Sequence, residues 1–160
     1  ADLRESNLSQ ANLREADLRH ANLSAAILCV ATLVGTTLYK ATLDYANLSI
    51  ANLCMANLSH ASLKKSVLIG TNLIGANLYM ADLTGAILHE SDLRESSLCG
   101  ANLVGANLRK TNLAMANLSR ADLRGADLSC ANLRQANLWH TNLEGVCLTG
   151  AVMPDGKVHR

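Results

Sequence analysis

Leucine recurs at every fifth position from Leu3 to Leu148 and occurs nowhere else in the chain, which makes thirty leucines in one register. A period of five fits neither common element. On an α-helix, five residues advance about 500°, so the leucines would spiral round every side. On a straight strand, an odd period would place successive leucines on opposite faces. Because this many leucines must be buried, the backbone has to bend once per unit and return each leucine to one interior.

A chain that bends equally every five residues coils on itself, so the spacing predicts a solenoid whose coils hydrogen-bond to their neighbours. An ordinary globular core is not expected, because the chain has no Phe and only 2% aromatic residues. The position two before each leucine slot is Ala, Ser or Thr in every unit except one, where it is Val146. Larger residues beside each leucine would overfill a narrow tube.

Each unit reads as a small residue, Asn or Asp, Leu and two freer positions, as in ANLVGANL at residues 101–108. This A(D/N)LXX pattern resembles the pentapeptide-repeat family over residues 1–155. The resemblance implies an all-β fold, a single right-handed parallel β-helix with four sides, in which four pentads form one coil. The chain would then make about eight coils, stacked about 4.8 Å apart. The closing VMPDG segment is similar to the ends of several cyanobacterial members.

We expect the β-helix to occupy residues 1–153 and residues 154–160 to form a turn that partly caps the last coil. Pro154 cannot donate a ladder hydrogen bond, and Asp155 followed by Gly156 is a strong turn signal. Because Ala1 is already in register, the alternative is a domain or fragment of a larger pentapeptide-repeat protein. Exposed strand edges in residues 1–7 favour end-to-end stacking of two rods.

The polar and glycine positions also follow the period. Nine of the ten glycines occupy the last slot of a unit, which predicts a corner with positive φ. Asn or Asp precedes the leucine slot in twenty-one units. These side chains are expected to hydrogen-bond the local backbone at each bend, and Asn can also form ladders between coils.

Charge and composition limit the kinds of partner, cofactor and compartment that we expect for this chain. The formal net charge is +1, and no polybasic tail or membrane-length apolar run is present, so we expect neither a nucleic-acid partner nor a membrane span. The five cysteines form no CxxC motif, which predicts free thiols, a reducing compartment and no metal or other cofactor. These features predict a cytoplasmic location, with a processed lumenal or periplasmic chain as the alternative.

Sorting residues by their place in a twenty-residue coil assigns them to four sides, centred on Leu3, Leu8, Leu13 and Leu18 and numbered one to four. Side four combines aromatic and cationic residues of the types common in protein interfaces. The alternative is that these are exposed residues tolerated at free positions. This candidate partner face consists of Tyr39, Tyr79, Trp139, His20, His60, His140, Lys40 and Arg120.

Side two carries apolar residues that the register points outward. A contiguous apolar area on a monomer often marks an interaction surface, and self-association into a homodimer is the simplest form of it. The alternative is that β-branched residues simply suit strand positions. This apolar association patch consists of Ile27, Val30, Ile50, Val67, Ile69 and Ile87.

Catalysis needs a concave pocket with convergent polar groups, and a filled tube with flat sides predicts none. We therefore expect a non-catalytic, rigid interaction scaffold that binds protein partners on an outer face. The adjacent His89 and Glu90 have no third partner in the sequence, which favours a surface pair. The family resemblance also implies an alternative, a DNA mimic that binds a type II topoisomerase. That mimicry depends on an acidic surface, which a net charge of +1 does not supply.

Overall fold

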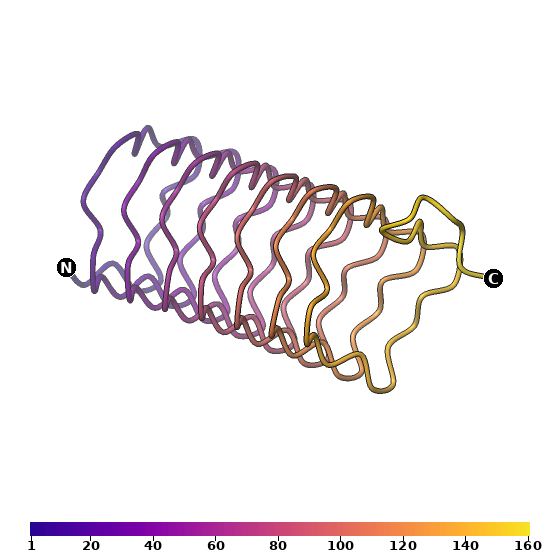
Figure 1. Cartoon of the computed structure of the whole chain (residues 1–160). Coiled ribbons are helices and arrows are strands. Elements are labelled where there is room, and N and C mark those ends of the chain that lie inside the picture. Colours follow the sequence, from indigo (N-terminus) through magenta and orange to yellow (C-terminus); the bar gives the residue numbers. More distant parts are fainter.

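The backbone winds as a stack of coils along one axis, with the N-terminus at one end and the C-terminus at the other (Figure 1). The computed structural model describes every residue from Ala1 to Arg160 and contains no helix and no extended strand. Instead, each pentad contributes one β-bridge residue followed after one residue by a two-residue turn, and this pattern continues through residues 154–155. The predicted all-β repeat fold is confirmed.

Parallel bridges fix the register between coils. Each bridge pairs a residue with the residue twenty positions later, from Asp2 with Asn22 through to Asn132 with Val152. From Leu3 to Leu133, the leucine N–H of each pentad donates to the next coil; for example, the N–H of Leu73 donates to the Asp92 carbonyl at 2.7 Å. Residues twenty apart therefore lie above one another, so a surface feature follows from position modulo twenty.

The leucines form one continuous core. Every leucine from Leu23 to Leu133 is at most 1% exposed, and the alanines beside them are buried as well. Leucines of the first coil and of the last pentads, such as Leu3 and Leu148, are only partly buried against this core. The inward column of leucine and small residues is confirmed. Burial of each leucine side chain contributes roughly 1.5–3 kcal/mol before the cost of ordering the chain.

Every corner of the coil has a residue with positive φ. The nine glycines predicted there have φ between 62° and 72°, which confirms that prediction. The same slot also holds twenty-one non-glycine residues with φ between 52° and 61°, including the β-branched Val30 and Ile50. This conformation costs an L-residue roughly 1–2 kcal/mol. The N–H of Ile50 donates to the Ile69 carbonyl at 2.9 Å, and such ladder bonds hold the corner in place.

The Asn and Asp side chains support the bends from outside. The Oδ1 atom of Asn72, for example, accepts the backbone N–H of Ile74 at 3.0 Å, and the same contact recurs along the chain. The predicted local role is therefore confirmed. A hydrogen bond between stacked amides occurs at one place, where Asn132 Nδ2 donates to Asn112 Oδ1 at 3.1 Å.

At the bend that follows Ser62, the side-chain acceptor comes from the preceding coil. Ser62 stands where most pentads have Asn or Asp, and its side chain is too short to reach the N–H two residues on. Asp44 replaces it: its Oδ1 accepts the Lys64 N–H at 3.0 Å and the Ser62 hydroxyl at 2.5 Å. The bend thus keeps its acceptor although its own pentad lacks one.

The last residues fold back on the final coil, as the yellow segment in Figure 1 shows. Val152 and Val158 form an antiparallel bridge. The N–H of Gly150 donates to the His159 carbonyl and the N–H of Met153 to the Lys157 carbonyl, each at 2.8 Å. Two backbone donors of the last pentads thus find their acceptors in the C-terminal segment.

Candidate interaction surfaces

The surface has no deep concave site. One depression lies on side three near the C-terminal end, and it is open to solvent. No group of three or more His, Cys, Asp or Glu side chains is arranged to hold a metal ion. The features with distinctive chemistry are therefore on the flat sides. The depression is lined by Ala114, Met115, Arg134, Gln135, Pro154, Asp155 and Gly156.

Four rings on side four form a continuous row across four coils. His20 and Tyr39 have ring centroids 5.7 Å apart, Tyr39 and His60 are also 5.7 Å apart, and His60 and Tyr79 are 5.5 Å apart. The interplanar angles lie between 82° and 89°. Edge-to-face contacts of this kind stabilise aromatic pairs beyond the area they bury, so each ring is held by its neighbours.

The row follows from where its members sit in the pentad. His20 and His60 occupy the corner slot with positive φ, at 56° and 58°, whereas Tyr39 and Tyr79 occupy the slot before the corner. On successive coils the two slots alternate, so each imidazole makes a T-shaped contact with a tyrosine ring from the coil above or below. The register predicted that these residues share one side, but their contacts were not predicted. The signal in the sequence is two histidines forty positions apart, each in the slot that follows the tyrosine slot of its pentad.

A second cluster lies further along side four. The guanidinium carbon of Arg120 lies 5.0 Å from the centroid of the Trp139 ring, and the His140 ring lies 4.0 Å from Trp139. The indole is 55% exposed, so it presents a large apolar surface with a cation on it. Stacking of a cation on indole contributes roughly 0.5–1 kcal/mol at exposed sites.

The eight residues of the candidate partner face thus lie in two groups. Lys40 belongs to the first, since its Nζ lies 5.2 Å from the Tyr39 ring centroid. Between the groups, Met80 extends over Gly100, and its Sδ lies 2.6 Å from the place where a Cβ of residue 100 would be. A side chain at Gly100 would displace Met80, so the glycine at this position leaves room for the Met80 side chain between the two groups.

Asp and Arg form bidentate pairs that sequence analysis did not predict. In Asp17 and Arg19, Nη2 lies 2.6 Å from Oδ2 and Nε lies 2.8 Å from Oδ1. The hydrogen bonds from the Arg19 side chain and backbone lower the pKa of Asp17 from 3.8 to about 2. The signal in the sequence is Asp-Leu-Arg, in which the Arg is the first residue of the turn that follows the Asp. The other such pairs are Asp2–Arg4, Asp92–Arg94 and Asp122–Arg124.

The apolar association patch is exposed in five of its six positions. Ile50 is the most exposed at 66%, and Val67 is partly buried. At Ile87 the patch meets a charged group that begins in the same pentad, where Glu90 Oε1 lies 3.4 Å from His89 Nε2 and 3.1 Å from Lys110 Nζ. The other exposed members are Ile27, Val30, Ile69 and Ile87.

The five cysteines are free thiols, and two of them, Cys130 and Cys147, are exposed. The Cys147 thiol lies 3.2 Å from the Ser129 hydroxyl. The hydrogen bond with Ser129, followed by those with Thr149, lowers the pKa of this thiol from its ordinary value. Its side-chain hydrogen-bond partners are these two hydroxyls, and no imidazole, amine or carboxylate group is in hydrogen-bond contact with it.

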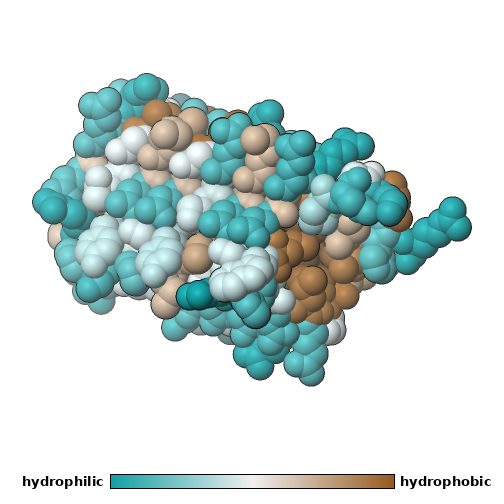
Figure 2. Space-filling view, viewed as in Figure 1, coloured by the Kyte–Doolittle hydropathy of each residue, from teal (hydrophilic) through white to brown (hydrophobic).

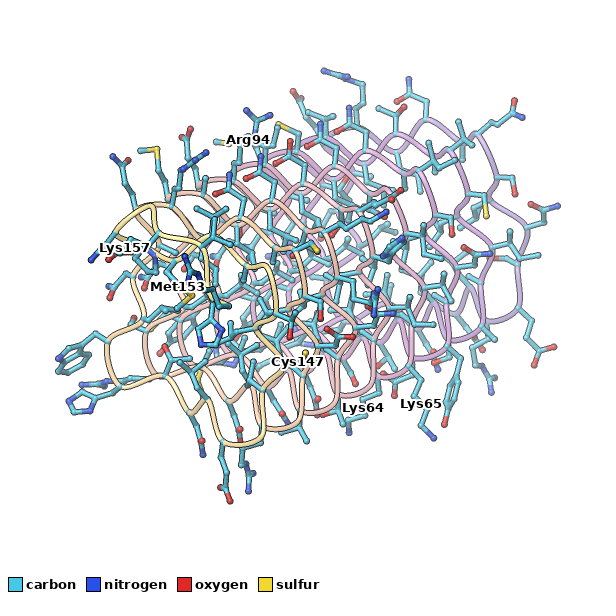
Figure 3. All side chains as sticks on the ribbon, turned by 90° about the vertical axis from the view of Figure 1, so that its right-hand side faces the viewer. Lys64, Lys65, Arg94, Cys147, Met153 and Lys157 are labelled. Atoms are coloured by element: carbon cyan, nitrogen blue, oxygen red, sulfur yellow. The ribbon has the colours of Figure 1, made fainter.

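The views along and across the coil show how the faces differ. In Figure 2, hydrophilic residues cover most of the visible face, and apolar residues gather toward the C-terminal end. Seen along the axis in Figure 3, Lys64 and Lys65 project from one side and Arg94 from the opposite side. Charged groups are therefore distributed around the tube rather than collected in one field. The chain has no helix of the length and hydropathy needed to cross a membrane.

Comparison with known families gives a match to pentapeptide repeats in eight copies, over residues 1–29, 55–89, 81–114 and 116–153. Among solved structures, the chain is similar to HetL, a pentapeptide repeat protein involved in heterocyst differentiation regulation in the cyanobacterium Nostoc sp. strain PCC 7120. The two are 39% identical over 99% of this chain and 83% of HetL, with a TM-score of 0.50.

Two further solved structures have the same kind of fold. Another Nostoc PCC 7120 pentapeptide repeat protein is 34% identical over 63% of this chain and 83% of its own, with a TM-score of 0.53. QnrB1, a plasmid-mediated fluoroquinolone resistance protein, is 16% identical over 91% of this chain and 88% of its own, with a TM-score of 0.56. At that identity the likeness to QnrB1 concerns the fold alone. Comparison with curated proteins gives no match.

Proposed function

The chain belongs to the pentapeptide-repeat family, and on that basis we propose that it is a non-catalytic, rigid scaffold that binds a protein partner on side four. The proposal includes the finer geometry expected of the family: a right-handed, four-sided coil of about eight turns. It also takes residues 1–153 as the β-helix and residues 154–160 as a partial cap, with Met153 inside the last coil (Figure 3).

The observation that carries the proposal is the ring row of His20, Tyr39, His60 and Tyr79. Each ring contacts the next edge-on at 5.5–5.7 Å, so the rings are ordered before any partner arrives. Binding to ordered aromatic side chains avoids part of the rotamer entropy that an interface otherwise costs. Tyr, Trp and Arg are the residues that most often dominate interface energetics, and Trp139 with Arg120 adds a second such group.

The flat shape of the tube also favours binding over chemistry. A backbone held by 115 main-chain hydrogen bonds presents side chains at fixed spacing, which suits recognition of a partner along the rod. HetL is involved in the regulation of heterocyst differentiation. A regulatory role exerted through protein contacts is therefore the role that we propose for this chain.

Capture of proteins from a cyanobacterial lysate tests the partner face. Wild-type chain is compared with Tyr79→Ala/Trp139→Ala and with a matched control, Tyr45→Ala/Met115→Ala, whose exposed side chains lie on sides one and three. We expect at least one protein to bind the wild type and the control and to be lost from the side-four variant, with loss of affinity of the purified pair measured by calorimetry. Equal capture by all three proteins would refute binding on side four.

A second candidate function is DNA mimicry toward a type II topoisomerase, as implied by the family. The charge distribution disfavours it, because the net charge is +1 and five Asp side chains are paired with Arg. A supercoiling assay distinguishes the two functions. The scaffold proposal expects no inhibition of the enzyme and no protection from a quinolone, and either effect would favour the mimic.

A further inference from the structure

Three successive coils carry a belt without ionisable groups apart from two cysteines. The belt consists of residues 26–35, 46–55 and 66–75, which contain no Asp, Glu, Lys, Arg or His and which form sides two and three of these coils. The other two sides of the same coils carry Lys40, Asp44, His60, Lys64, Lys65 and Asp82. Charge is therefore absent from one half of the tube surface over these coils and present on the other half.

Apolar side chains project from this belt. Ile50 is 66% exposed and Met55 is 65% exposed, although aliphatic residues of this size are usually buried. Ile27, Val30 and Ile69 are also exposed, at 39–52%. Depletion of charge with exposed aliphatic residues is the composition of the core of a protein interface. The belt extends the apolar association patch from side two onto side three.

Charged residues border the belt at both ends. Arg14 and Glu15 precede it on side three, and Glu90, Arg94 and Glu95 follow it on the fifth coil. All five are exposed. An apolar centre with a charged border is the arrangement of an interface core and its rim, and it gives the belt defined limits along the rod.

We propose that the belt is the contact surface between two copies of this chain, packed side by side and antiparallel about a two-fold axis. This goes beyond the proposed function, because the partner face lies on side four and stays free. A second copy fits for a geometric reason. Its coils have the same spacing, about 4.8 Å, so rows of side chains on one copy match the grooves between rows on the other along the whole contact.

The side-chain sizes along the belt are also complementary to those of a second, identical copy. Along the corner between sides two and three, Val30 and Ile50 have exposed side chains, whereas Gly70 has none. A Cβ at Gly70 would lie 3.8 Å from Ile50 Cγ1, at van der Waals distance. A two-fold axis at Ile50 sets Val30 of each copy opposite Gly70 of the other. Such self-complementarity is what a symmetric dimer requires. No charge is buried, so no desolvated ion needs a partner.

The contact is small. Three coils span only about 14 Å along the rod. The area that this contact buries is therefore toward the lower end of the range for stable complexes. We therefore expect a monomer–dimer equilibrium that depends on concentration. Because the contact is apolar, added salt should not dissociate the dimer. Closure by a two-fold axis limits the assembly to two chains.

Sedimentation equilibrium over a wide concentration range tests the belt. The wild type is expected to approach about 34 kDa, twice the chain mass of 17.0 kDa. Ile50→Lys should remain near 17.0 kDa, because it places a charge at the centre of the contact. Lys already occupies the same corner slot at Lys40, Lys65 and Lys110 with φ of 52–55°, so the variant is expected to fold.

Met115→Lys is the matched control, because Met115 also has positive φ and is 57% exposed but lies outside the belt. It should dimerise like the wild type. Mixing Ile50→Lys with Ile50→Asp should restore the dimer mass, because the two copies meet at this residue. A wild type that stays monomeric, or an Ile50→Lys variant with unchanged association, would overturn the proposal. An open-ended series of masses that persists in Ile50→Lys would indicate end-to-end stacking instead.

Discussion

The imidazole of His60 and the phenol ring of Tyr79 form a T-shaped pair with ring centroids 5.5 Å apart, although the two residues are on successive coils. Their backbones are joined as well, since the N–H of His60 donates to the Tyr79 carbonyl at 2.8 Å. Main-chain pairing thus brings the two rings into contact without any local sequence motif. The contact of Arg120 with Trp139 and that of Lys110 with Glu90 are assembled in the same way, from residues about twenty positions apart.

Leu73→Ala tests the core column. Leu73 is fully buried in the middle of the rod, so the substitution leaves a cavity that the regular coils above and below cannot fill. We expect a loss of about 2–5 kcal/mol in the free energy of unfolding, measured by urea denaturation. Leu143→Ala serves as the control, because Leu143 is only partly buried and should cost clearly less. Equal losses would contradict a closed central column.

Met115→Gly tests the strain at the corners. Met115 has a φ of 61° and is largely exposed, so glycine relieves the left-handed conformation while removing little buried surface. We expect unfolding by urea to show unchanged or higher stability, by up to about 1 kcal/mol. The neighbouring Ala114 lies outside the left-handed region, and Ala114→Gly should lower stability by about 0.5–1 kcal/mol. The opposite order would refute strain at the corner slot.

Asn72→Ala tests the external support of the bends. The Oδ1 atom of Asn72 accepts the Ile74 N–H at 3.0 Å, and alanine removes that acceptor. A loss of about 0.5–1.5 kcal/mol is expected, measured as the shift in the midpoint of chemical unfolding. Asn72→Asp keeps the acceptor and should restore most of the stability at neutral pH. If Asp behaves like Ala, the side chain supports the bend in another way.

The Asp–Arg pairs predict how stability depends on pH. Hydrogen bonds from Arg4 and Arg19 hold the pKa of Asp2 and of Asp17 at about 2, below the ordinary 3.8. A carboxyl with a lowered pKa in the folded state stabilises the fold above its ordinary pKa, and this contribution is lost as pH falls toward the folded value. The thermal midpoint should therefore decrease between about pH 4 and about pH 2.

The variant Asp17→Asn checks the origin of that decrease. Asn cannot titrate, so the fall in the thermal midpoint on acidification should be smaller in the variant than in the wild type. Asn57→Asp provides a comparison at the equivalent slot of a coil where Ser59, not Arg, follows two residues later. An identical acid profile for wild type and Asp17→Asn would show that this pair does not contribute to the pH dependence.

The leucine spacing was sufficient to predict a solenoid with a buried leucine column, and the positions of the glycines predicted the corners with positive φ. The all-β class came from the resemblance to the pentapeptide-repeat family. With a period of five, the leucines can all be buried only if the backbone bends once per pentad. These features therefore depend on the backbone and on residues such as Leu73, which must lie in the interior. The positive φ of Val30 and Ile50 was not predicted. Propensity alone argues against it, and the ladder hydrogen bonds of the whole coil override that preference.

The candidate surfaces were predicted only as sets of residues. Position within the coil placed His20, Tyr39, His60 and Tyr79 on one side, but their edge-to-face contacts depend on side-chain rotamers. The hydrogen bonds that Asp44 accepts at the bend of Ser62 also depend on a side-chain rotamer, that of Asp44. Such contacts between coils could not be derived from one pentad at a time.

The pairing of each residue with the residue twenty positions later has an evolutionary consequence. Duplication of one whole coil would lengthen the rod and leave every downstream residue on its original side. Duplication of a single pentad would keep the leucine column intact but move every downstream residue to the next side, breaking up the ring row and the charge-free belt alike. Gene lengthening that preserves binding is therefore expected in steps of four pentads, whereas single-pentad steps create new surfaces on an unchanged interior.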